Sequence, residues 1–458
     1  MPLYFKSKAV EHPVVGLACP TGCLPTTPSA SKKSLPWTAR SLLGVSALQL
    51  PKNPLVGRAV PSAPLSLAGT IPTVNCPLST VNCPAPSRLL SIIGILFAIT
   101  VAAVNTPAQS QPFTPRLSLD VATRYNDNLL LSPTTPLRDF SEVVSPRVGF
   151  LYGQPDRTYI GLDYKAEIER FFSHEEFDAN NQFITLDTQA LFPHSILQLH
   201  QSFRDVAGPN SEIGGWEREQ RNRTIVTAEY QLNSKSSLGL DYLQDIRDYL
   251  TAGTINSRTF VIGGTLYYHW LPKTDLLAQF NQGWVHVNRG VDAAYEELNV
   301  GFRGQLTEKI TGTATVGYQH REMDGIGSSI DAPVAGLELK AIPTGRTIID
   351  LYGTRTIDAS SGFINRRYVV NRLYLTMRYR LFRSVMLSVG GECEFRENAL
   401  AIASETYKRD ILAVPVGVNY DLTKWLQLGA TYRCQRVDYT TIGHAIQNFA
   451  SLHVKIHY

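Results

Sequence analysis

The sequence lacks the long apolar runs that build membrane-spanning helices. A spanning helix needs about 20 predominantly apolar residues, and the longest such run here extends only from Leu89 to Val104. Apolar residues at helical spacing are also missing from the rest of the chain. These two absences exclude a helical membrane protein and a helical bundle.

Cysteine is scarce in the body of the chain. Only Cys393 and Cys434 follow residue 83, and they fall on predicted strands that are not neighbours. The Cα atoms of a disulfide lie within about 7 Å of each other. We therefore interpret both residues as small apolar side chains.

Motifs for catalysis or metal binding are absent as well. The chain contains no G-x-S-x-G, H-E-x-x-H or P-loop pattern. His453 and His457 lie on one predicted strand, where their spacing is about 13 Å and too long to share a metal. We predict no enzymatic activity, no catalytic residue, no cofactor and no metal site. A triad assembled from separate strands is the alternative that missing motifs leave open.

An excess of one charge is confined to the N-terminal part. The whole chain carries +4, but residues 1–108 hold eight Lys and Arg and a single acid, Glu11. The remainder keeps 35 of the 43 basic and 38 of the 39 acidic residues, a net charge of −3. A nearly balanced body excludes nucleic acid as a partner, because nucleic-acid binding requires a basic surface.

The first 108 residues divide into two segments. Residues 1–80 are rich in Pro, Ser and Leu without a sustained period, which predicts a disordered leader. A tandem repeat spans Thr73 to Pro86, and no Met lies between Met1 and Met323. Our hypothesis is that translation begins at an alternative codon near Val81.

Residues 81–108 have the pattern of a signal peptide. Arg88 precedes the apolar run, and small residues follow it, so we expect cleavage after Ala108, with Ala103 as second choice. A membrane anchor is the alternative, and the short run disfavours it. The mature body, residues 109–458, is then exported.

From Leu117 onward apolar and polar side chains alternate. Leu373, Leu375 and Met377 alternate with Arg372, Tyr374 and Thr376, for example. The same period of two recurs in residues 158–168, 238–247, 297–306, 310–321, 385–396, 426–435 and 446–458. A period of two predicts β-strands with one apolar and one polar face.

The links between the predicted strands alternate in length. Short links fall at residues 153–157, 193–195, 233–236, 272–275, 307–309, 343–346, 382–384 and 422–424, and longer ones at 126–141, 205–220, 323–331, 358–367 and 398–407. Short turns at one end and long loops at the other are typical of outer-membrane barrels. We predict an all-β, antiparallel, up-and-down transmembrane β-barrel of about 18 strands (16–18), with both termini periplasmic.

The last strand, Ile446 to Tyr458, ends on an aromatic residue carried by its apolar face. It resembles the C-terminal strand of bacterial outer-membrane barrels, which the barrel assembly machinery reads, although Phe is the usual final residue. We expect this strand to pair with the first, Leu117–Thr123.

A soluble sandwich would show the same alternation. The signal peptide, the turn pattern and aromatics near strand ends favour a barrel in lipid of a Gram-negative outer membrane; these aromatics are Tyr164, Tyr230, Tyr268, Trp270, Trp284 and Trp425.

Charged residues on the predicted polar face are the candidate site. We interpret them as pore-lining residues that select solutes by charge; they are Arg303, Arg372, Arg378, Arg380, Glu392, Glu394 and Arg433. The alternative interpretation is cross-strand pairing that stabilises the wall.

Two segments near the start of the body suggest a family. Residues Arg124 to Leu129 read R-Y-N-D-N-L, and Val143 to Gly149 read V-V-S-P-R-V-G. These segments and the topology resemble outer-membrane β-barrel porin families, including barrels encoded with exopolysaccharide and exosortase-type systems. The resemblance implies a channel for small solutes or a barrel that assists polysaccharide export. The alternative to a porin is a non-conducting structural or accessory barrel.

Overall fold

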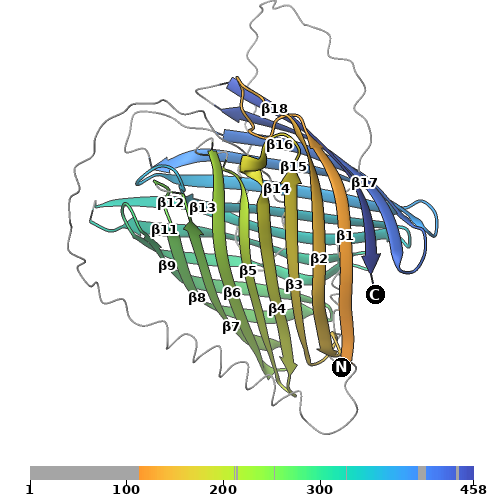
Figure 1. The fold of residues 1–458 in the computed structure, drawn as a ribbon. Coiled ribbons are helices and arrows are strands. Elements are labelled where there is room, and N and C mark those ends of the chain that lie inside the picture. The colour runs from red at the N-terminus through yellow and green to blue at the C-terminus, as the bar shows by residue number, and fades with distance from the viewer. Residues whose placement is uncertain are drawn as a thin grey trace, which may run out of the picture.

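The computed structural model describes residues 113–210, 212, 215–251, 253–325, 327–400, 409–439 and 443–457. The predicted leader at 1–80, the signal peptide at 81–108 and Tyr458 lie outside these residues. Eighteen antiparallel strands form a single sheet that closes into a barrel (Figure 1). Among the described residues, no helix is long and apolar enough to cross a membrane.

The strands follow one another around the barrel in chain order. They are β1 (Phe113–Asn126), β2 (Asp139–Gly153), β3 (Tyr159–Phe171), β4 (Ala179–Leu191), β5 (Ser195–Asn210), β6 (Gly215–Asn233), β7 (Ser236–Tyr249), β8 (Ser257–Leu271), β9 (Thr274–Val287), β10 (Ala293–Thr307), β11 (Ile310–Met323), β12 (Ser328–Thr344), β13 (Thr347–Ala359), β14 (Arg367–Arg380), β15 (Val385–Leu400), β16 (Arg409–Asp421), β17 (Leu426–Tyr439) and β18 (Gly443–His457). A 3₁₀ helix, η1 (Glu175–Phe177), lies between β3 and β4.

The barrel closes where β1 pairs with β18. Their register runs from Ser118 opposite His457 to Asn126 opposite Phe449. This pairing confirms the predicted contact between the first and last strands, and the strand number confirms the predicted architecture. His453 and His457 lie on the lumen face of β18, opposite Ala122 and Ser118 of β1.

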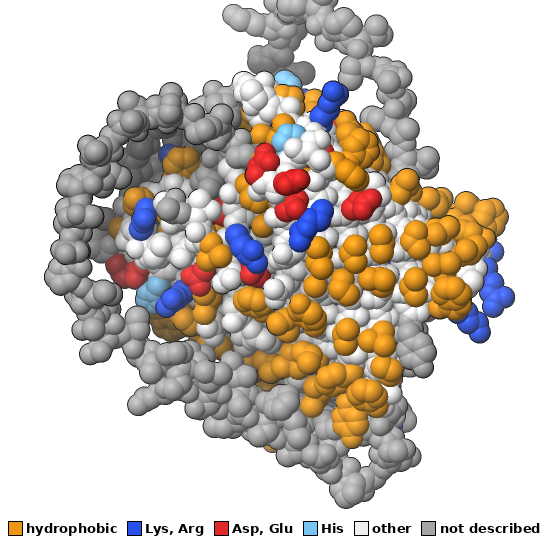
Figure 2. Space-filling view, in the orientation of Figure 1, with side chains coloured by type: hydrophobic (Ala, Val, Ile, Leu, Met, Phe, Trp, Pro, Cys, Tyr) orange, Lys and Arg blue, Asp and Glu red, His pale blue; other side chains and the backbone are white. Residues whose placement is uncertain are grey.

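The outer face of the wall is apolar and the inner face is polar, because side chains on each strand point alternately to the two sides. Leu373, Leu375 and Met377 of β14 are exposed outside. Figure 2 shows hydrophobic side chains covering the visible wall, with acidic and basic residues gathered toward the loop end. The aromatics expected near strand ends are exposed: Tyr164, Tyr230, Tyr268, Trp270, Trp284 and Trp425.

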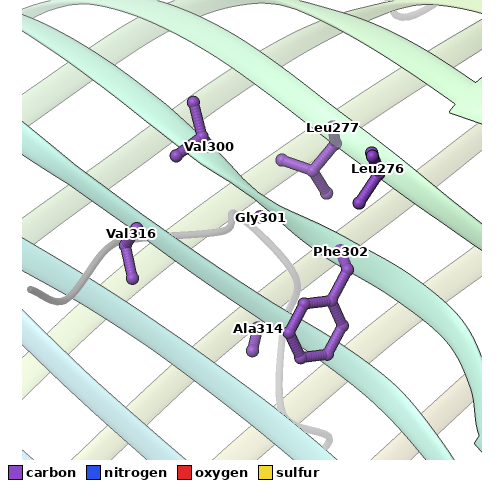
Figure 3. Close-up of a pocket in the computed structure, with 7 residues that line it drawn as sticks. All are labelled: Leu276, Leu277, Val300, Gly301, Phe302, Ala314 and Val316. Carbon is purple, nitrogen blue, oxygen red and sulfur yellow. The ribbon is translucent and has the colours of Figure 1, made fainter.

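An apolar pocket of about 470 Å³ lies on the wall formed by β9, β10 and β11 (Figure 3). It is lined by Leu276, Leu277, Val300, Gly301, Phe302, Ala314 and Val316. No lining side chain carries a charge or a polar group. Such a surface suits a lipid chain better than a polar solute.

The prediction of a long loop at residues 205–220 is wrong. Here β5 and β6 continue as a hairpin to Asn210 and Gly215. The outer face of this extension carries Asp205, Arg218 and Gln220, with Arg218 donating to Asp205 over 2.6 Å. Because that outer face is polar, the alternation of apolar and polar residues ends before the two strands end. The sequence pattern therefore predicted a loop where the structure has a hairpin.

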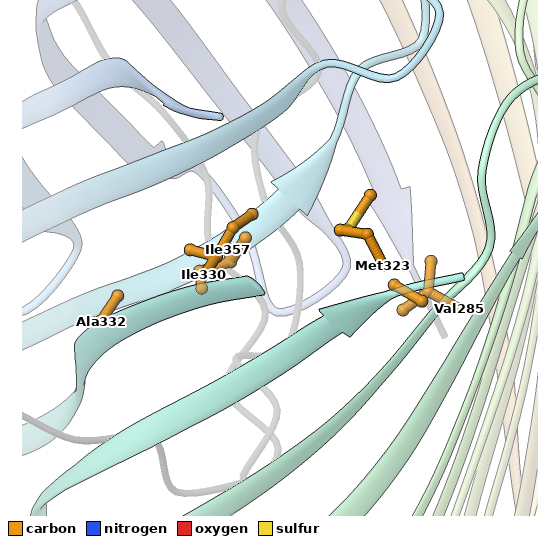
Figure 4. Close-up of a cluster of buried hydrophobic side chains, with 6 residues drawn as sticks. Val285, Met323, Ile330, Ala332 and Ile357 are labelled. Atoms are coloured by element: carbon orange, nitrogen blue, oxygen red, sulfur yellow. The ribbon is translucent and has the colours of Figure 1, made fainter. Parts of the chain in front are cut away.

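The loop-side end of β13 and β14 leaves the wall and folds into the barrel. β12 pairs with β13 only up to Ala335 opposite Arg355, so residues 328–334 of β12 have no partner on β13. Ile357 of β13 packs instead against the inner face of β9–β12 (Figure 4). The buried cluster comprises Val285, Ala293, Met323, Ile330, Ala332 and Ile357, with Val369 of β14 packed against it. We call residues 355–371 the inner hairpin.

Candidate functional site

The tip of the inner hairpin, residues 360–366, is bound by the end of the β5–β6 hairpin on a distant part of the wall. The Glu212 carboxylate accepts hydrogen bonds from the Ser360 hydroxyl and from the backbone N–H and hydroxyl of Ser361, the last two at 3.2 and 2.8 Å. Asn210 Nδ2 also donates to the Ser361 hydroxyl over 3.2 Å. We call Glu212, Ser360 and Ser361 the latch.

The latch is buried and charged. Glu212 is 8% exposed and its carboxylate lies 3.8 Å from the Arg396 guanidinium. Burial, the largest single influence, raises the pKa of Glu212, but Arg396, the serine hydrogen bonds and Arg409 together outweigh it. The pKa of Glu212 therefore lies below its usual value of 4.5. The latch accordingly carries an ionised carboxylate at neutral pH.

Two further loops hold the same tip. Ile255 N–H donates to the Ser361 carbonyl over 2.8 Å, and Val291 N–H donates to the Asn365 amide oxygen over 2.8 Å. Arg367 donates to the Val291 carbonyl over 2.7 Å. The inner hairpin is thus fixed to the β7–β8 and β9–β10 loops as well as to Glu212, and it crosses the lumen near the loop end.

The β1–β2 loop is also held in place, by contacts with β18 and with the segment between β3 and β4. Asn128 is buried, and its amide donates to the carbonyls of Ser132 and Ile446, both at 3.0 Å. Asp127 accepts from the backbone and side chain of Asn448 at 2.6 and 2.7 Å. Leu129 is fully buried against Phe171 and Phe177. The R-Y-N-D-N-L segment of the sequence is therefore a structural anchor at the β1–β18 seam.

The lumen face of the inner hairpin looks toward β6 and β7. Asp358 of β13 interacts electrostatically with Arg247 of β7, and Tyr352 of β13 with Arg223 of β6. On the β6–β7 side, Arg221 donates to both oxygens of Asp245, and Arg247 adds a third bond over 3.2 Å. We call these two facing walls the constriction.

The predicted pore-lining residues of β14 and β15 meet at the constriction. Arg372 bonds Asp358 over 2.9 Å and Glu394 over 2.7 Å. Glu394 also accepts from Arg396 and Arg409 at 2.6 and 2.9 Å. Arg372 stands opposite Glu394 in the β14–β15 register, so this ion pair joins two neighbouring strands.

The other predicted residues lie elsewhere on the inner face. Arg303 bonds Glu229 through two nitrogens at 2.8 Å and Asp275 at 2.9 Å. Arg433 bonds Glu392 over 2.5 Å, Arg378 pairs with the Asp350 carboxylate, and Arg380 is exposed at the turn end of β14. These pairs are the cross-strand contacts of the alternative interpretation. They are compatible with a pore-lining role, because the same side chains face the lumen.

Sequence reasoning missed the latch and half of the constriction. Glu212, Ser360 and Ser361 fell in predicted loops, and Arg221 and Arg247 were not singled out. A period of two reports which face a side chain occupies, but not which distant strand lies across the lumen. A run of Ser-Ser-Gly after Asp358 gave no signal beyond that of a turn.

The comparisons with known proteins agree with the fold. Residues 282–456, which run from β9 to β18, match the family described as Putative beta-barrel porin 2. No curated protein matches the sequence.

Three solved structures resemble the barrel. OccK3 (OpdO) of Pseudomonas aeruginosa is 12% identical, with a TM-score of 0.42, covering 75% of this chain and 96% of that one. OccK1 (OpdK) of the same organism is 12% identical, with a TM-score of 0.42 and coverages of 75% and 99%. OccAB3 of Acinetobacter baumannii is 13% identical, with a TM-score of 0.40 and coverages of 75% and 99%. Over residues 282–456 the chain is therefore similar to the β-barrel porin family, and its described part forms one closed 18-stranded antiparallel barrel.

Proposed function

We propose that this barrel is a channel for small solutes whose path runs along its inner face and past the constriction. The observation that carries the proposal is a closed 18-stranded wall with a charged inner face, crossed by one inward-folded hairpin. A barrel of this strand number encloses a lumen wide enough for water and solutes. The inner hairpin narrows that lumen at the loop end, which favours small solutes over polymers.

The constriction offers both signs of charge along the path. Arg372, Asp358 and Glu394 are held by mutual ion pairs, so they present fixed partial charges without needing to rearrange. Conduction requires sites that bind a solute weakly enough to release it. Our proposal therefore keeps Arg303, Arg372, Arg378, Arg380, Glu392, Glu394 and Arg433 as pore-lining residues.

We also propose the usual orientation, with the short turns and both termini of the chain on the periplasmic side. The support is the difference in link length between the two ends of the barrel. In this orientation the latch and the inner hairpin face the outside of the cell.

The test is single-channel recording from the purified, folded barrel in planar lipid bilayers. Stable ohmic steps would support the channel, with folding verified by a heat-dependent shift on electrophoresis. A silent bilayer with folded protein would refute it and would favour the accessory barrel in envelope or exopolysaccharide assembly. Replacement of Arg380 by Glu should shift the reversal potential toward cations, and an unchanged potential would remove this residue from the path.

A further inference from the structure

Arg223 differs from the other arginines on the inner wall of the constriction. Arg221 and Arg247 bond Asp245, and Arg204 bonds Glu219 with both contacts at 3.0 Å. Within the described residues, Arg223 has neither a hydrogen bond nor an ion pair, and its Nε atom is buried without a partner. A buried N–H group that has no acceptor is costly.

The nearest carboxylate cannot satisfy Arg223. Asp245 stands directly opposite Arg223 in the β6–β7 register. Both of its oxygens are bonded by Arg221, and one also accepts from Arg247. Asp245 therefore has no oxygen left without a bond to another arginine, and Arg223 gains no hydrogen bond from it.

Two carboxylates of the facing wall are already bonded by other arginines. Asp358 is bonded by Arg372, and Glu394 by three arginines, Arg372, Arg396 and Arg409. The side chain of Tyr352 on the facing wall lies in the neighbourhood of Arg223. The Tyr352 ring in turn lies 6.0 Å from the Tyr374 ring at an angle of 37°, so the two aromatic surfaces adjoin each other.

From these contacts we propose that the lumen contains a subsite for a small oxyanion, centred on Arg223 and faced by Tyr352. The guanidinium donates to a carboxylate or phosphate oxygen, and the two tyrosine rings contact the organic part of the solute. The subsite rests on the proposed function only for its route of access. It deepens that function by naming the class of solute that pauses at the constriction.

Binding can be measured whether or not the barrel conducts. With the full barrel in detergent micelles, the ¹⁹F line of trifluoroacetate should broaden in proportion to occupied protein. Substitution of Arg223 by Gln should weaken the apparent affinity at least about ten-fold, because a bond to a charged group is lost. The matched control is Arg383→Gln, which removes the same charge from the exposed turn between β14 and β15.

The outcomes separate the possibilities. Equal broadening by the wild type and R223Q would overturn the subsite, as would equal weakening by R223Q and R383Q. Inorganic phosphate added as a competitor distinguishes the solute: displacement at lower concentration than acetate supports a phosphate-bearing solute, and the reverse order supports a carboxylate.

Conductance tests the function separately. A folded barrel that binds trifluoroacetate through Arg223 but stays silent in bilayers would refute the channel and keep the subsite. A conducting barrel in which R223Q changes neither trifluoroacetate binding nor the anion-to-cation ratio would support the channel and refute the subsite. Tyr352→Phe should retain more than half of the broadening, since it keeps the ring and removes only the hydroxyl.

Discussion

Two segments fold into the mouth of this barrel, and they are held by different forces. The β1–β2 loop is held by buried Leu129 and by amide bonds of Asn128 to the backbone. The tip of the inner hairpin is held by the carboxylate of Glu212 together with backbone bonds from the β7–β8 and β9–β10 loops. Amide and apolar contacts do not titrate, whereas a carboxylate does. The comparison teaches that the buried Leu129 contacts, which we call the seal, do not respond to acid, whereas the Glu212 contact of the inner hairpin does.

The largest effect should come from the apolar back of the inner hairpin. Ile357→Asp would bury a carboxylate in the cluster around Met323 and Ile330, at a cost of several kcal/mol. We expect the hairpin to leave the lumen and the single-channel conductance to rise severalfold. Ile364→Asp is the control, because Ile364 is 60% exposed at the tip. Equal conductance in the two variants would show that the hairpin does not obstruct the path.

The next effect should come from the seal. Leu129→Ala removes a fully buried side chain and should cost about 2–5 kcal/mol. The expected result is a lower unfolding temperature of the barrel in detergent with an unchanged conductance. A variant that conducts more but melts normally would show that the β1–β2 loop, too, is a movable gate.

Removing the latch charge should have a smaller and more specific result. Glu212→Gln keeps the shape but loses the ion pair with Arg396, which should shift the closed-to-open ratio about ten-fold. The measurement is the frequency of high-conductance steps, compared with Asp438→Asn, which breaks an exposed pair with Arg436. Identical step frequencies in both variants would leave the latch without a role.

Acidification should reproduce the Glu212→Gln effect in the wild type. The pKa of Glu212 is lowered, so the ionised carboxylate stabilises the latch near neutral pH and this contribution is lost as pH falls through the lowered pKa, below pH 4.5. High-conductance steps should therefore become more frequent in that range. Glu212→Gln should not respond to pH there; a pH response that persists in it would assign the switch to another group.

The smallest effect is expected at Asp127. Asp127→Asn loses a charge but can still accept from the Asn448 backbone, so the unfolding free energy should change by about 1 kcal/mol or less. Thermal unfolding would measure it. A shift as large as that of Leu129→Ala would mean that charge, rather than apolar contact, seals the seam.

Much of the fold was predictable because a strand in a lipid-facing wall must alternate. The faces of Arg372, Leu373 and Glu394 followed from a period of two, and the even strand number followed from turns and loops. The inner hairpin was not predictable, since Ile357 alternates as a lipid-facing residue would and yet packs on the inside of β12. The latch was missed for the same reason: Glu212 and Ser361 meet across the lumen, and no local pattern records a distance across an open space.

The contact between β1 and β18 has a consequence for how the molecule is made. Every other strand pair of the described barrel joins neighbours in the chain, but this pair brings Ser118 opposite His457. Contacts so distant along the chain form slowly, and until this one forms both edge strands expose unpaired backbone groups. Ring closure therefore requires the first and the last strand of the described barrel to be present together, so we expect it to follow the pairing of the strands between them.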